Sequence, residues 1–134
     1  MAIRENAVRA KKNKQIREGT YDLNKLEVPR HYAKELEKNL KLIERYGKEN
    51  GLSNEQIAML KEVEIIGARQ AYLEEKNEEA ERTGDIFARR DIKYNNEEID
   101  ALNEQYLKRE SKLGNHVHKI GEFIEKQNTK TNGR

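Results

Sequence analysis

The chain has 134 residues, the length of one domain, and only 34% of them are hydrophobic, with two Phe and no Trp. Charged residues of both signs make up 39% of the sequence and the net charge is +2, which excludes a uniformly basic nucleic-acid-binding protein. The balance is typical of long solvated helices around a thin core. Because there is no cysteine, a disulfide framework and a thiolate metal site are also excluded.

Neither a membrane span nor a signal peptide is visible in the sequence. No run approaches the roughly 20 apolar residues that a membrane-spanning helix needs. The start "MAIRENAVRAKKNK" lacks the apolar stretch of a secretory signal peptide. The sequence therefore predicts a soluble cytoplasmic protein with no membrane partner.

The N-terminal segment carries most of the excess positive charge. Within the first 19 residues, six cations against two acids give a net charge of +4. Because these residues offer little apolar area, residues 1–28 are expected to form a flexible basic arm and a linker. The arm is interpreted either as a solubilising tail or as a segment that contacts the phosphates of duplex DNA, since no aromatic residue is interleaved for base stacking. The predicted DNA-binding residues are Arg4, Arg9, Lys11, Lys12, Lys14 and Arg17.

Residues 29–83 are predicted to form an antiparallel helical hairpin. Pro29 suits the first position of a helix, which is expected to end near residue 50. Ser53 is expected to cap the second helix, over residues 54–82, with Gln56 as its capping-box partner. The short connection between the two helices predicts a tight antiparallel turn.

The second helix of this hairpin is apolar around most of its circumference. One neighbouring helix cannot cover all of that surface, and leaving it exposed would favour aggregation. The sequence therefore predicts a homo-oligomer larger than a dimer. Glu64 falls within the apolar arc and is interpreted as the partner of an Arg from another subunit rather than as a carboxylate with a perturbed pKa. The predicted oligomerisation residues are Ile57, Leu60, Val63, Ile66 and Tyr72.

Residues 84–134 are predicted to form a third long helix followed by a polar tail. Asn95 is the expected N-cap, with Glu98 as its reciprocal partner, and apolar residues then recur every three or four positions. Gly114 marks either a break or a continuous turn in this helix. A second, smaller group of cations precedes it and is the next candidate for DNA contact: Arg89, Arg90 and Lys93.

No catalytic or cofactor-binding pattern is present. His116 and His118 form the pair most similar to metal ligands, but their spacing places them on different faces of a helix. There is no glycine-rich phosphate loop and no nucleophile motif. The sequence therefore predicts an all-α protein that is not an enzyme and holds no cofactor or metal.

The order of these elements resembles the small terminase subunits of tailed phages, over roughly residues 1–128. The likeness rests on the basic arm, the helix "VPRHYAKELEKNLKLIERYG", the turn "GLSNEQ", the helix "IAMLKEVEIIGARQAYLEE", a glycine-containing break and a late helix started by Asn. One departure is that residues 1–28 are too short and polar for the N-terminal helix-turn-helix that many small terminases carry.

The resemblance implies a DNA-packaging protein of the host cytoplasm during virion assembly. Such a subunit assembles into a ring through its central hairpin, recognises viral double-stranded DNA and delivers it to the large terminase subunit. On this chain it places DNA contact on the basic arm and oligomerisation on residues 29–83. The alternative is a helical interaction protein with no DNA role, such as a phage assembly chaperone or an inhibitor of a host protein.

Overall fold

A computed structural model describes residues 2–84 and 86–132. Within these residues the chain forms five α-helices and one short 3-10 helix, with no strand, which confirms the predicted all-α class. No helix in the described ranges is both long enough and apolar enough to cross a membrane. The elements are α1 (Ala2–Glu18), η1 (Leu23–Lys25), α2 (Arg30–Glu49), α3 (Asn54–Thr83), α4 (Ala88–Leu113) and α5 (His116–Asn132).

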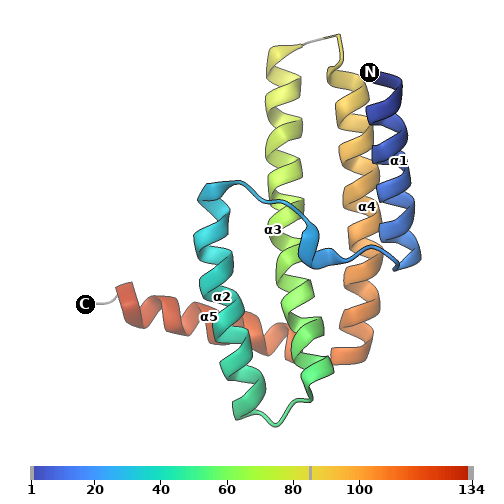
Figure 1. The fold of residues 1–134 in the computed structure, drawn as a ribbon. Coiled ribbons are helices and arrows are strands. Elements are labelled where there is room, and N and C mark those ends of the chain that lie inside the picture. Colours follow the sequence, from blue (N-terminus) through green and yellow to red (C-terminus); the bar gives the residue numbers. More distant parts are fainter. Residues whose placement is uncertain (1, 85, 133–134) are drawn as a thin grey trace.

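Helices α2 and α3 run in opposite directions on either side of a tight turn (Figure 1). The Ser53 side chain accepts a hydrogen bond from the Gln56 backbone at 3.1 Å, and the Gln56 side chain accepts one from the Ser53 backbone at 2.9 Å. This reciprocal pair is the predicted capping box, and it starts α3 at the predicted residue. Gly51, at a φ of 68°, supplies the left-handed conformation that ends the preceding helix.

Residues 2–18 form a helix that packs along α4, whereas the sequence predicted a flexible arm (Figure 1). Ile16 anchors this helix, because only 1% of its surface is exposed. It belongs to an apolar cluster between α1, η1, α3 and α4, whose buried members include Leu23, Ile66 and Leu102. Among the described apolar side chains of α1, Ile16 is thus the one that reaches the core.

The C-terminal third of the chain differs from the single predicted helix. Helix α4 already begins at Ala88, so Asn95 lies inside it and is not the predicted N-cap. The Asn95 side chain is buried and joins three helices instead: it accepts from Arg9 Nη2 at 2.7 Å and donates to Asn77 Oδ1 at 2.9 Å. Gly114, at a φ of 59°, ends α4, so the predicted helix is interrupted at this residue. The following helix, α5, contacts α2 (Figure 1).

Candidate nucleic-acid interface

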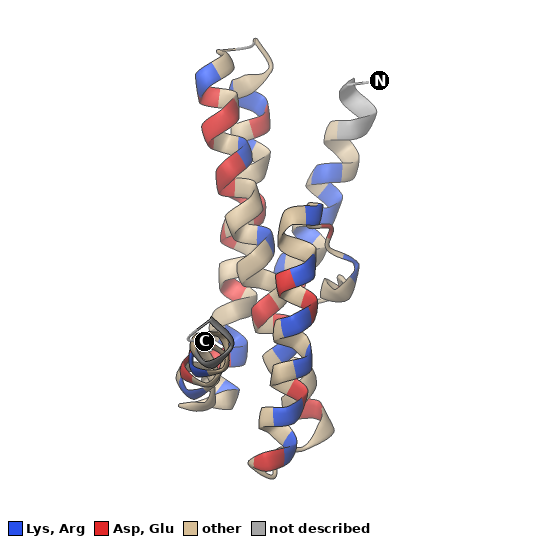
Figure 2. Ribbon diagram, turned by 90° about the vertical axis from the view of Figure 1, so that its left-hand side faces the viewer, with Lys and Arg blue, Asp and Glu red and all other residues tan. Residues whose placement is uncertain are grey.

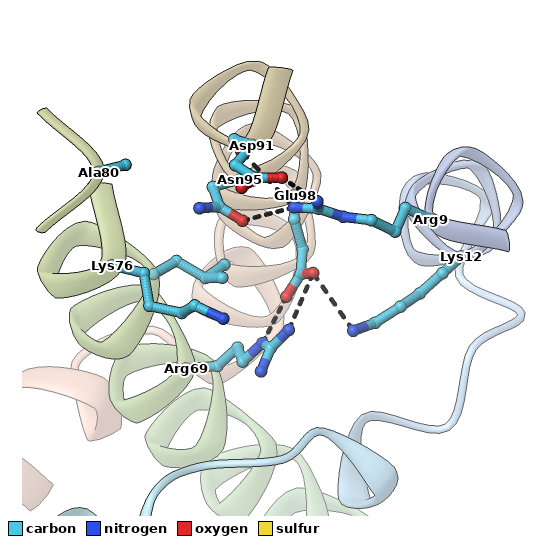
Figure 3. Close-up of a pocket in the computed structure, with 9 residues that line it drawn as sticks. Arg9, Lys12, Arg69, Lys76, Ala80, Asp91, Asn95 and Glu98 are labelled. Carbon is cyan, nitrogen blue, oxygen red and sulfur yellow. Dashed lines mark hydrogen bonds and ion pairs between the residues drawn. The ribbon is translucent and has the colours of Figure 1, made fainter. Parts of the chain in front are cut away.

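Three of the cations predicted to bind DNA are ion-paired with α4: Arg9, Lys12 and Arg17. Arg9 Nη1 lies 3.0 Å from Asp91 Oδ1, and Lys12 Nζ lies 3.2 Å from Glu98 Oε1 (Figure 3). The Lys12 side chain is 24% exposed and its Glu98 partner 7%. Arg9 and Lys12 therefore help to hold α1 against α4, with part of their charge already balanced by carboxylates of the same chain.

The remaining predicted cations on α1 face solvent to different degrees. Arg17 Nε lies 3.5 Å from a carboxylate oxygen of Glu104 on α4, and Lys14 pairs within α1 at 3.9 Å, with Glu18. Lys11 is exposed and makes no ion pair with the described residues. The side chain of Arg4 lies outside the described part of the chain. Among the described cations of α1, Lys11 and Lys14 are exposed and make no ion pair with another helix, so part of the charge of α1 is already balanced within the fold.

Glu98 is the centre of the ion-pair cluster that joins α1, α3 and α4 (Figure 3). Arg69 donates two hydrogen bonds to the Glu98 carboxylate, from Nε to Oε2 at 2.6 Å and from Nη2 to Oε1 at 3.1 Å. The third donor of Arg69, Nη1, reaches the backbone oxygen of Glu27 at 2.7 Å, which fixes the segment before α2. The cluster is a structural element that sequence reasoning missed, because it joins residues far apart in the chain.

The pKa values within this cluster follow from burial and from charge. Burial acts to raise the pKa of Glu98, but hydrogen bonds and positive charges from Arg69 and Lys12 outweigh it and hold the pKa below its usual value. Burial lowers the pKa of Lys12, and the nearby Arg69 charge lowers it further against the opposing effect of Glu98. The site therefore combines a stably ionised carboxylate with a crowded set of cations.

A second group of cations, not singled out in the sequence, lies along α2. These residues recur every three or four positions, so they fall on one face of the helix, opposite the buried face. All of them are exposed, and Figure 2 shows basic segments recurring along α2 from one end to the other. We call this set the α2 basic face: Arg30, Lys34, Lys38, Lys41, Arg45 and Lys48.

Only the C-terminal end of the α2 basic face is paired. Arg45 Nε lies 3.1 Å from Glu49, and Lys48 Nζ lies 3.5 Å from Glu44. The Arg45 guanidinium also lies above the Phe123 ring of α5, at 5.6 Å from its centroid. The other four cations make no ion pair with the described residues, although acidic side chains at positions 35 and 37 flank them on the same helix. The free part of the face thus lies toward the start of α2.

The predicted oligomerisation residues are largely covered by the chain's own helices. Ile57, Leu60 and Ile66 have 4%, 1% and 0% of their surfaces exposed, and Val63 and Tyr72 are half-buried. Helices α2 and α4 both pack against α3, so the apolar circumference that the sequence assigned to other subunits is satisfied within one chain. The three buried residues therefore pack within the chain, and the predicted homo-oligomer stays a prediction.

The other candidates from the sequence take part in contacts within the chain. His116 Nδ1 lies 2.8 Å from the Tyr46 hydroxyl, and His118 Nε2 lies 3.0 Å from Glu122 on the next turn. Glu64 accepts from Asn39 Nδ2 at 3.0 Å within the same chain, and the expected Arg of another subunit stays a prediction. Among the described residues, no three side chains gather in a way that could hold a metal ion.

The second, smaller group of cations predicted from the sequence is exposed on the first turns of α4: Arg89, Arg90 and Lys93. Arg90 lies over the Phe87 ring at 5.5 Å.

Comparison with protein-family models, with the curated proteins and with the solved structures found no match to this chain. The function of this protein is therefore inferred from its own residues and their contacts.

Proposed function

We propose that this protein binds double-stranded DNA through phosphate contacts made by the α2 basic face. The observation that carries the proposal is the alignment of six exposed cations on one helix face, four of them without an ion-pair partner in the described residues. At 1.5 Å per residue, the face extends over about 27 Å. Duplex DNA carries one charge per ~1.7 Å of its axis, so a helix of this length spans several phosphates.

The proposed contact is with the DNA backbone and not with base edges. Lysine predominates among the free cations of the α2 basic face, and lysine acts as a point charge toward phosphate. Direct reading of bases relies mainly on side chains such as Asn, Gln and bidentate Arg. We therefore expect binding that depends strongly on salt and weakly on DNA sequence.

The resemblance to small terminase subunits supplies the proposed biological setting. In that setting the protein acts in phage DNA packaging, has no enzymatic turnover of its own, and presents DNA to a large terminase subunit. A ring-like homo-oligomer is part of this proposal, but its contacts have to involve surfaces other than the buried face of α3. Light scattering at micromolar concentration tests this part, and a monomer would remove the ring from the proposal.

The DNA-binding proposal is tested by fluorescence anisotropy with a short labelled duplex at several salt concentrations. Lys34→Gln/Lys38→Gln removes two free cations from the α2 basic face. If both contact phosphates, the slope of log affinity against log salt becomes shallower by about 1.8, since each phosphate contributes about 0.9. The matched control is Lys108→Gln/Lys112→Gln, which neutralises two exposed lysines with the same spacing on α4. Equal effects of the two double variants, or no binding by the full chain, would falsify the proposal.

One observation favours a second candidate, a helical interaction protein with no DNA role. Arg9, Lys12 and Arg17 are satisfied by carboxylates of the same chain, which removes half of the cations that the sequence assigned to DNA. Absence of duplex binding by the full chain at low salt would favour this candidate.

A further inference from the structure

A solvent-open cavity lies where α1, α3 and α4 meet, apart from the α2 basic face (Figure 3). Its volume is about 350 Å³, which is at the lower end of the range for small-molecule sites. Leu73 and Ala80 give it an apolar wall on α3. Six charged side chains from three helices line the rest: Arg9, Lys12, Arg69, Lys76, Asp91 and Glu98.

The charges around the cavity do not balance. Four of the lining side chains are cations and two are carboxylates, so the cavity carries a net charge of +2 when all are ionised. Asn95, which also lines it, turns its oxygen to Arg9 and its amide nitrogen away to Asn77. The carboxylates are themselves engaged with Arg9, Lys12 and Arg69. The lining therefore keeps an excess of two positive charges, which a bound anion would balance.

Lys76 accounts for much of this excess. It is the lining cation that makes no ion pair with any described residue, and its ammonium group lies 5.3 Å from the centroid of the Tyr72 ring. Figure 3 shows its side chain extending from α3 toward α4, on the same side as Arg69. An ammonium group has three donors, and that of Lys76 donates no hydrogen bond to the described residues.

The other cations also keep donors in reserve. Arg69 uses three N–H groups on Glu98 and the Glu27 backbone, which leaves two of its five. The Lys12 ammonium group pairs with Glu98 and lies 5.9 Å from the centroid of the Tyr21 ring. The lowered pKa of Lys12 reflects burial beside another cation. A bound anion would relieve this crowding, because it adds negative charge where positive charge is in excess.

We propose that this cavity binds a phosphate group, with Lys76 as its principal ligand and with Arg9, Lys12 and Arg69 around it. A phosphate suits the site because it carries up to two negative charges, which matches the net charge of the lining. Its oxygens also point in several directions, so one group can accept from both α1 and α3. The source is either free phosphate or pyrophosphate, or the phosphates of a nucleotide, and the two share this chemistry.

Occupancy of the cavity would tie α1 more firmly to α3. The Arg9 and Lys12 side chains come from α1 and the Lys76 side chain from α3. Helix α1 packs mainly against α4, so a shared ligand would add a link between α1 and α3. A ligand that binds only the folded chain raises the midpoint of thermal unfolding with its concentration. The phosphate site is thus detectable without any activity assay.

The test is thermal unfolding of the full chain, followed by circular dichroism, in increasing sodium phosphate or pyrophosphate at ionic strength matched with sodium chloride. We expect a saturable rise in the unfolding midpoint that chloride does not give. Lys76→Gln should weaken pyrophosphate affinity at least tenfold by calorimetry. Lys108→Gln, an exposed lysine on α4 that does not line the cavity, is the matched control and should bind as the unaltered chain does. Equal pyrophosphate affinity in the two variants, or equal midpoints in phosphate and chloride, would overturn the proposal.

Two further arms identify the source of the phosphate and separate this site from the DNA-binding proposal. Adenosine triphosphate binding more tightly than pyrophosphate assigns the site to nucleotides, and equal affinity assigns it to free phosphates. Lys34→Gln/Lys38→Gln, which alters only the α2 basic face, should keep pyrophosphate affinity unchanged. Loss of pyrophosphate binding in that double variant would contradict a separate site, whereas loss of DNA binding alone would leave the cavity intact.

Discussion

Arg69 on α3 and Glu98 on α4 form a bidentate ion pair, with N–O distances of 2.6 and 3.1 Å. The two side chains are only 11% and 7% exposed. A buried pair of this kind contributes little compared with an apolar pair, because both charges lose their hydration. Removing one member is different, since it leaves the other charge buried without a partner. The pair therefore makes the junction of α3 and α4 sensitive to single substitutions.

We expect Glu98→Ala to lower the free energy of unfolding by about 3–5 kcal/mol, the range for breaking a buried ion pair. Chemical denaturation followed by circular dichroism measures the change. Glu49→Ala, which breaks the exposed pair with Arg45, is the control and should have little effect. A loss as small as that of the control would show that Glu98 is solvated in solution.

The stability of the protein should fall in acid because of Glu98. Its pKa is depressed in the folded chain, so the folded chain binds fewer protons there than the unfolded chain does. The contribution is complete above the pKa of an unfolded Glu, about 4.3, and is lost as the pH falls through the lower folded value. Denaturation midpoints are measured from about pH 7 down to about pH 3, a range that contains these pKa values. As the pH falls, the midpoint should decline less steeply for Glu98→Gln than for the unaltered chain. Parallel curves would exclude Glu98 as the source.

Ile16 provides a test of whether α1 is docked. Ile16→Ala should cost about 3 kcal/mol of stability, because it empties a site in the core at 1% exposure. Val8→Ala is the control on the same helix, since Val8 is 62% exposed and little is lost by truncating it. If α1 were a flexible arm, both variants would unfold at the same denaturant concentration as the unaltered chain.

Two glycines in helices should respond to alanine in opposite directions. A Cβ at Gly47 would overlap Ile57, with the Ile57 Cδ1 atom 2.6 Å away, so Gly47→Ala should destabilise by about 1–3 kcal/mol. At Gly67 nothing lies within 4 Å of a Cβ, and alanine there should stabilise by about 1 kcal/mol through helix propensity. Thermal unfolding of both variants gives the two signs, and a stabilised Gly47→Ala would mean that α2 and α3 pack less closely than described.

Features encoded by neighbouring residues could be predicted from the sequence. The Ser53 and Gln56 capping box involves positions three apart, so its geometry follows from local spacing alone. The same local pattern at Asn95 led to a wrong prediction, because an Asn followed three residues later by Glu98 also fits the interior of a helix when distant partners are present. Local spacing does not distinguish the two cases.

The fate of the basic residues depended on contacts that the sequence does not display. Arg9 meets Asp91, which lies 82 positions away, and no spacing rule connects them. The α2 basic face, in contrast, could have been predicted, because its three-and-four periodicity is visible in the sequence. A charged outer face is also usual for a solvated amphipathic helix, so the periodicity alone does not indicate a binding role.

The position of α1 against α4 has a consequence for how the chain folds. Its side-chain contacts join residues 81 to 88 positions apart, so they close loops of more than half the length of the chain. Contacts of such high sequence separation lose much chain entropy before they are rewarded, and they form late. During synthesis, the hairpin of α2 and α3 is complete while α4 is still being made. We expect α1 to remain undocked on the nascent chain, with Arg9, Lys12 and Arg17 unpaired, until their carboxylate partners on α4 have been synthesised.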